Sequence, residues 1–159
     1  MDITNFFKVQ KNITNNRIID ESLSEYKVFA RKHLQLHIKM SDLANETKCS
    51  TYWINDTTTF NKKSTFNKYI TCLREIISLA LDNDYENLSE IEVIPSEYCL
   101  SDQFLNLYID INDLVMSSSL DHFVTILEDF LSLGLSLGFT EKDIEHEFCN
   151  NIDNIEMAL

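Results

Sequence analysis

The stretch Lys39-Met40-Ser41-Asp42-Leu43-Ala44-Asn45-Glu46-Thr47-Lys48-Cys49, followed by Tyr52-Trp53, organises this chain of 159 residues. It has the pattern of the last turns of a long helix that leads into a loop with two large aromatic residues. Lys39, Asp42 and Glu46 stand at positions i, i+3 and i+7, so they share one face of that helix.

A later segment, Lys68-Tyr69-Ile70-Thr71, repeats this arrangement. Lys68, Thr71 and Glu75 again stand at i, i+3 and i+7, on the face opposite the apolar residues of a second long helix. Each helix therefore carries a lysine, then a small or acidic residue, then a glutamate. We expect the two polar faces to be opposed in the folded protein.

The periodicity of apolar residues predicts an all-α fold, as a single domain over residues 1–159. The chain contains only two glycines and one proline, too few for the tight turns of an all-β fold. Capping boxes at Ser22 with Glu25 and at Thr140 with Asp143 are predicted to start two of the helices. The predicted helices cover about 3–13, 22–46, 66–81, 104–115, 123–137 and a last one from 140, with loops at about 49–64 and 83–102.

The charge of the chain is unevenly distributed. Residues 1–74 carry 12 Lys and Arg against 7 Asp and Glu, whereas residues 75–159 carry 1 against 19, which makes the acidic half strongly negative. This acidity disfavours nucleic-acid binding. It is compatible with a solvated surface, with attraction between the two halves, or with a basic protein partner.

The four cysteines are far apart in sequence and form no Cys-x-x-Cys pair. Together with the lack of a signal peptide, this predicts reduced thiols in a cytoplasmic protein. The longest apolar run, 130–139, is too short to span a bilayer, so no membrane association is expected.

Several separated segments resemble the dimeric, all-helical dUTP diphosphatases (dUTPases), relatives of the MazG-type nucleotide pyrophosphohydrolases. Leu43 to Cys49 with Tyr52-Trp53 resembles the family's Leu-Ala-Asn-Glu…Trp segment. Phe6 to Gln10 with Arg17-Ile18-Ile19 resembles its first helix, and 130–140 resembles its penultimate helix. The resemblance covers nearly the whole chain and implies a helical bundle of the all-α NTP pyrophosphatase type that forms a homodimer.

The resemblance also implies a chemistry, the hydrolysis of dUTP to dUMP and pyrophosphate. In the family, Glu-x-x-Glu and Glu-x-x-Asp motifs on two helices hold Mg²⁺ on the phosphates. The corresponding positions of this chain are Lys39 and Asp42 in the first motif and Lys68 and Thr71 in the second. We call these four the motif positions. Because a lysine offers only donors and a positive charge, it cannot bind Mg²⁺.

We therefore expect a dUTPase-like protein without a metal cofactor, which has lost hydrolysis and acts by binding a nucleotide or a protein. The two lysines would pair with nearby carboxylates or contact the phosphates of dUTP or dUMP directly. Gln10 and Trp53 are the candidate contacts to the base, by resemblance. The alternative is an active nucleotide pyrophosphohydrolase with a relocated Mg²⁺ or Mn²⁺ site formed by Asp42, Glu46 and Glu75.

Overall fold

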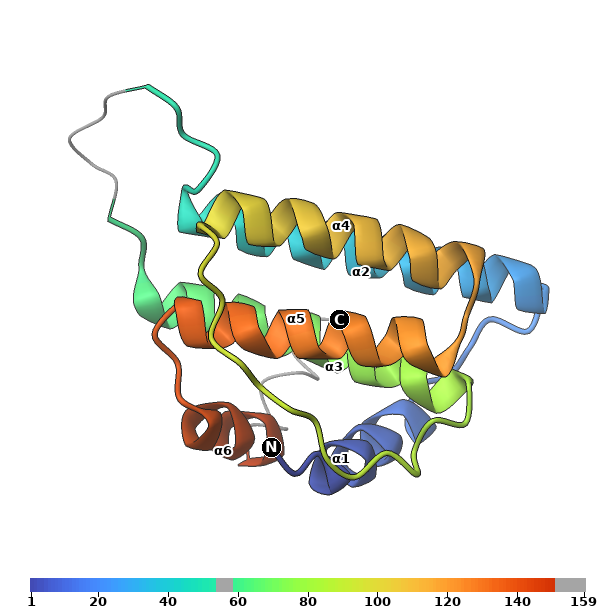
Figure 1. Ribbon diagram of the computed structural model, residues 1–159. Helices are drawn as coiled ribbons and strands as arrows, with labels where there is room; N and C mark the ends of the chain where they lie inside the picture. The colour runs from blue at the N-terminus through green and yellow to red at the C-terminus, as the bar shows by residue number, and fades with distance from the viewer. Residues whose placement is uncertain (54–58, 151–159) are drawn as a thin grey trace.

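The computed structural model describes residues 1–53 and 59–150, which form six helices (Figure 1). This confirms the predicted all-α fold; residues 54–58 of the predicted loop and 151–159 of the predicted domain lie outside the described residues. The helices are α1 (Thr4–Asn15), α2 (Glu25–Thr47), α3 (Lys62–Asp82), α4 (Leu100–Met116), α5 (Leu120–Ser136) and α6 (Glu141–Asn150).

Two helical pairs build the body of the molecule. α2 packs mainly on α3, and α4 packs mainly on α5. Figure 1 shows α2 and α4 together in one layer over α3 and α5, while α1 and α6 lie on the far side of α3 and α5. The prediction of two long helices facing two others, with a short helix at each end, is confirmed.

The helix ends show which local signals were interpreted correctly. Thr140 and Asp143 form the predicted capping box: the amide of Asp143 donates to Thr140 Oγ1, and the amide of Thr140 donates to Asp143 Oδ2, both at 3.1 Å. The predicted box at Ser22 is wrong. Ser24 is the N-cap of α2 and accepts from the amide of Lys27 at 3.4 Å, because Ser22 donates its own hydroxyl to Asp20 Oδ1 instead, at 2.7 Å.

The centre of the core lies where α3 meets α5. Tyr69 is fully buried and stacks on Phe130 with ring centroids 4.6 Å apart. Its hydroxyl donates to the carbonyl of Phe130 at 3.2 Å. Gly134, one turn after Phe130, leaves room for this ring, because a Cβ at Gly134 would lie only 2.7 Å from Tyr69 Cζ. Gly134 therefore allows α3 to approach α5 closely.

The segment between α3 and α4 runs back along the molecule and is tied to it at several points. Its residues 89–91 pair with the first residues of the chain, where the amide of Ile3 donates to the carbonyl of Ser89 at 2.9 Å. Further along, Ser132 on α5 donates to the carbonyl of Ile94 at 2.6 Å. Among the described residues, no single helix has the length and hydropathy to cross a membrane; α5 and α6 reach that threshold only together, as a pair bent by 109°.

Candidate functional site

Opposite charges face each other at both ends of the contact between α2 and α3. Near the start of α2, Lys32 Nζ lies 2.7 Å from Asp82 Oδ1. Near its end, Glu46 Oε2 lies 2.8 Å from Lys68 Nζ. The hydrogen bond from Lys68 is the main cause that lowers the pKa of Glu46 below its ordinary value. Lys68, one of the motif positions, is thus paired with a carboxylate of the opposite helix.

In the middle of the same contact, the charge of Lys39 on α2 acts favourably on the carboxylate of Glu75 on α3. The Glu75 side chain is only 13 % exposed, and Arg17 Nη2 lies 4.0 Å from its Oε1. Burial raises the pKa of Glu75, while the charges of Arg17, Lys39 and Lys32 oppose that rise. Lys39 therefore lies where its ammonium group partly neutralises a buried carboxylate.

These three pairs form a regular series, which we call the charge ladder. Successive members are seven residues apart on each helix: Lys32, Lys39 and Glu46 on α2 face Asp82, Glu75 and Lys68 on α3. Seven residues make two helical turns, so all three pairs lie along one edge of the antiparallel helix pair. The expectation that polar groups of the two helices face each other is met along this edge.

The remaining motif positions offer little to a metal ion. Thr71 donates its hydroxyl to the carbonyl of Asn67 on its own helix at 2.9 Å. Asp42 is exposed and is the only carboxylate among the four. Within residues 1–53 and 59–150, no three His, Cys, Asp or Glu side chains gather closely enough to hold a metal ion. The relocated site of Asp42, Glu46 and Glu75 is not assembled in this arrangement, and it stays a prediction.

A row of polar groups lies on the inner face of α1 and just past its end. Gln10 and Thr14 lie one turn apart on α1, Arg17 follows two residues after the last helical residue, and Gln10 is only 1 % exposed. Gln10 Oε1, Thr14 Oγ1 and Arg17 Nε are buried atoms that have no hydrogen-bond partner among the described residues. Because native proteins seldom leave buried polar atoms unpaired, this row indicates a place where a polar ligand can bind. Arg17 connects the row to Glu75 in the charge ladder.

Trp53 lies away from this row. It lies in the segment that follows α2, and Figure 1 shows this segment leaving the bundle at the upper left, whereas α1 lies below the bundle. The Trp53 side chain is 58 % exposed and packs edge to face on Tyr52, with ring centroids 5.2 Å apart. Within one chain the structure does not bring Gln10 and Trp53 together.

The sequence analysis singled out Gln10 but missed Thr14 and the role of Arg17. For Thr14 the available signal was its spacing, which places it with Gln10 on the side of α1 that carries Phe6 and Phe7, whereas Arg17 lies beyond the end of α1. The outer pair of Lys32 and Asp82 was also missed, although it extends the spacing already seen at positions 39, 46, 68 and 75 by one further heptad.

Comparison with known proteins gives one match. The family model described as dUTPase matches residues 2–156. No curated protein and no solved structure matches the chain. The matched range contains all six helices, the motif positions and the polar row of α1, and it agrees with the resemblance seen in the sequence. The chain therefore belongs to the dUTPase family.

Proposed function

We propose that this member of the dUTPase family has lost Mg²⁺-dependent hydrolysis of dUTP and acts by binding a nucleotide. The observation that carries the proposal is the charge ladder, in which ammonium groups take two of the four motif positions. Lys68 is bonded to Glu46, and Lys39 lies beside the buried Glu75. A divalent cation at this place would meet two positive charges and only one carboxylate of the motif, Asp42.

Retention of nucleotide binding is supported by the polar row on α1. A uracil ring presents a donor between two acceptors, and the carboxamide of Gln10 can offer both a donor and an acceptor to that edge. Its Oε1 is buried without a partner. Lys39 and Lys68 are candidate phosphate contacts, since lysines serve as point charges for phosphates in other proteins. Trp53 would join the base only from a second chain or after movement of its loop.

Calorimetry with dUTP and dUMP, with and without Mg²⁺, tests this proposal. We expect binding that does not require Mg²⁺ and no release of pyrophosphate. Gln10→Met, which keeps the volume of the side chain and removes its polar atoms, should weaken binding, whereas Gln35→Met on α2 should not. No heat with either nucleotide would refute nucleotide binding.

Robust release of pyrophosphate from dUTP with Mg²⁺ or Mn²⁺ would instead favour the alternative, an active enzyme that uses Asp42, Glu46 and Glu75. A gain-of-function variant tests where the motif lies. The triple variant Lys39→Glu, Lys68→Glu, Thr71→Asp would restore the four carboxylates, and we expect Mg²⁺ to raise its melting temperature but not that of the wild type. A folded triple variant that ignores Mg²⁺ would show that the motif was assigned to the wrong residues.

We also propose that the protein is a homodimer that uses the outer face of α2. Leu34 and Ile38 are 59 % and 46 % exposed there, with Arg31 before them and Asp42 after them on the same side of the helix. Two copies of α2 packed antiparallel would bury the apolar residues and place each Arg31 near the Asp42 of the other copy. Light scattering should show a dimer for the wild type and a monomer for Ile38→Glu. A monomeric wild type would refute this assignment.

A further inference from the structure

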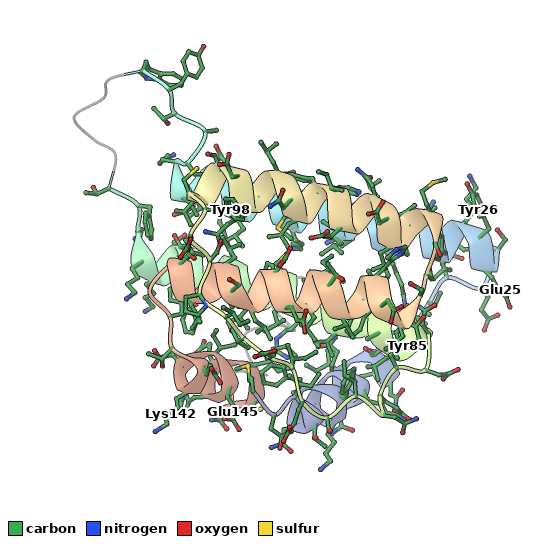
Figure 2. All side chains as sticks on the ribbon, viewed as in Figure 1. Glu25, Tyr26, Tyr85, Tyr98, Lys142 and Glu145 are labelled. Carbon is green, nitrogen blue, oxygen red and sulfur yellow. The ribbon has the colours of Figure 1, made fainter. Side chains whose placement is uncertain are left out.

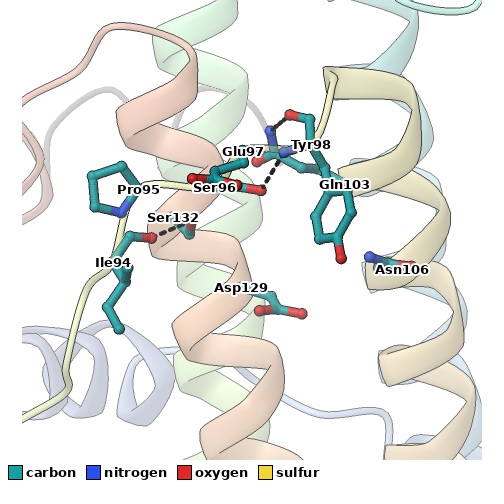
Figure 3. A pocket seen from close by; sticks show the side chains of 9 residues that line it. All are labelled: Ile94, Pro95, Ser96, Glu97, Tyr98, Gln103, Asn106, Asp129 and Ser132. Carbon is teal, nitrogen blue, oxygen red and sulfur yellow. Dashed lines mark hydrogen bonds between the residues drawn. The ribbon is translucent and has the colours of Figure 1, made fainter.

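A polar cavity lies away from the charge ladder. It has a volume of about 540 Å³ and is enclosed by residues 94–98, α4 and α5. Figure 3 shows the side chains of Tyr98, Asn106 and Asp129 pointing toward one space between the two helices. Glu97 also lines the cavity, so a carboxylate is present on the connecting segment as well as on α5.

The frame of this cavity is held by side chains that are not free for a ligand. Gln103, 6 % exposed, donates from Nε2 to the carbonyl of Tyr98 at 2.7 Å, and its Oε1 accepts from Ser136 at 3.2 Å. The bond from Ser132 to the carbonyl of Ile94 closes the other side. The Tyr98 side chain itself is 66 % exposed, so its ring and hydroxyl are presented at the cavity. Hydrogen bonds within the protein therefore hold the walls of the cavity, and the Tyr98 ring, the Asn106 amide and the Asp129 carboxylate line it and can contact a ligand.

The carboxylates around this cavity lie in a stretch that contains no Lys or Arg between residues 75 and 141, and His122 on α5 exerts the smallest of the effects that act on Asp110. Asp110, one turn after Asn106 on α4, has a buried Oδ2 atom without a hydrogen-bond partner. Burial, and then the charge of Asp129 across the helix pair, raise the pKa of Asp110 to about 7. In the charge ladder Lys32 and Lys68 each contact a carboxylate directly, whereas here the repulsion between Asp110 and Asp129 is opposed by the smaller effect of His122, so a cation from outside would be favoured.

We propose that this cavity binds the guanidinium group of an arginine side chain presented by a basic partner protein. Asp129 can accept two parallel hydrogen bonds from the planar guanidinium, and the amide oxygen of Asn106 can accept another. The exposed Tyr98 ring offers a surface on which the guanidinium can stack. The surrounding negative charge of residues 75–159 would steer a basic partner to this side of the molecule. This site does not depend on the proposed nucleotide binding.

Titration of ¹⁵N-labelled protein with the blocked tripeptide acetyl-Gly-Arg-Gly-amide, followed by NMR, tests this assignment. We expect the amide signals of Tyr98, Asn106 and Asp129 to move, with a dissociation constant of about 1 mM. The same peptide with citrulline, a neutral analogue of arginine of nearly the same shape, should leave them in place. Asp129→Asn should weaken binding about tenfold, and Tyr98→Leu about threefold.

The matched control is Glu145→Gln, which removes one negative charge on α6, away from Tyr98 (Figure 2). It should bind the arginine peptide as the wild type does, and the spectrum of each variant reports whether it is folded. Equal weakening by Glu145→Gln and Asp129→Asn would overturn the proposal, because the attraction would then be unspecific. So would equal shifts with the citrulline peptide, no shifts at all, or tighter binding of spermidine at the same residues, which would make the ligand a free polyamine.

Discussion

Replacement of Asp110 by Asn should stabilise the protein, by an amount that grows from about pH 4 and is largest above about pH 7. The pKa of Asp110 is raised from its ordinary value of 3.8 to about 7, first by burial and then by Asp129 on α5, with a smaller contribution from Asp113 on α4 and an opposing one from His122 on α5. Below pH 3.8 the carboxyl group is protonated in both the folded and the unfolded state, so its ionisation does not lower the free energy of unfolding. Above that pH the unfolded chain loses the proton more readily, so the folded state loses stability until the pH passes about 7.

The difference between 3.8 and about 7 corresponds to at most about 4 kcal/mol of unfolding free energy. Because Asp110 is only partly buried and shares its proton with Asp129, solvent screening should reduce this to about 1–2 kcal/mol. Asp110→Asn should recover that amount at pH 8, a rise of about 3–6 °C in melting temperature for a domain of this size. At pH 5 the gain should be roughly a third as large.

Urea unfolding followed by circular dichroism at pH 5 and pH 8 measures the effect. Glu145→Gln, with the same loss of charge on an exposed part of α6, should change the unfolding free energy by less than about 0.5 kcal/mol at both pH values. Equal gains from Asp110→Asn at pH 5 and pH 8, or no gain at pH 8, would refute the reasoning. The first result would indicate relief of packing rather than of charge, and the second would mean that the two carboxylates are well solvated.

Two further predictions concern the core and the charge ladder. Gly134→Ala should lower the free energy of unfolding, measured in urea, by about 2 kcal/mol, because the added Cβ would overlap the Tyr69 ring. Adding Tyr69→Phe to this variant should restore part of the lost stability. Purely additive effects of the two changes would contradict the packing argument. Lys39→Gln should destabilise the protein by about 0.5–1 kcal/mol at pH 8 and by less at pH 5, because the pKa of the largely buried Glu75 would rise further. The control is Lys63→Gln, on the exposed start of α3. A loss of stability that does not grow with pH would rule out Glu75 as the cause.

Most of the fold could be predicted because the helices carry their own signals. Apolar spacing located all six, and the start of α6 was found from the capping box of Thr140 with Asp143. The starts of α3 and α4 were predicted about four residues late. Their first turns consist mostly of polar residues, and Asn61, which caps α3 by accepting from the amide of Ser64, lies outside the apolar pattern.

The candidate site was predictable only in part. Spacing placed Lys39, Glu46, Lys68 and Glu75 on two helical faces, but it could not say which residue meets which, since that depends on how far one helix is displaced along the other. The cavity at Tyr98 was not predicted, because its walls come from three segments that no periodicity links. Tyr98 lies in a stretch without helical spacing, which the hydrogen bonds of Gln103 and Ser132 hold against α4 and α5.

The order of signs in the charge ladder fixes the register of α2 against α3. A slip of seven residues in one direction would set Lys39 opposite Lys68, and a slip in the other direction would set Glu46 opposite Glu75. Each slip keeps the apolar faces roughly in phase, yet each creates at least one repulsive contact. Had α2 carried three lysines against three acids, both slips would have remained attractive. In the third pair the signs are reversed, with the acid on α2 and the lysine on α3, and this favours a single alignment of α2 against α3. A chain with Glu46 and Lys68 exchanged should lose that preference.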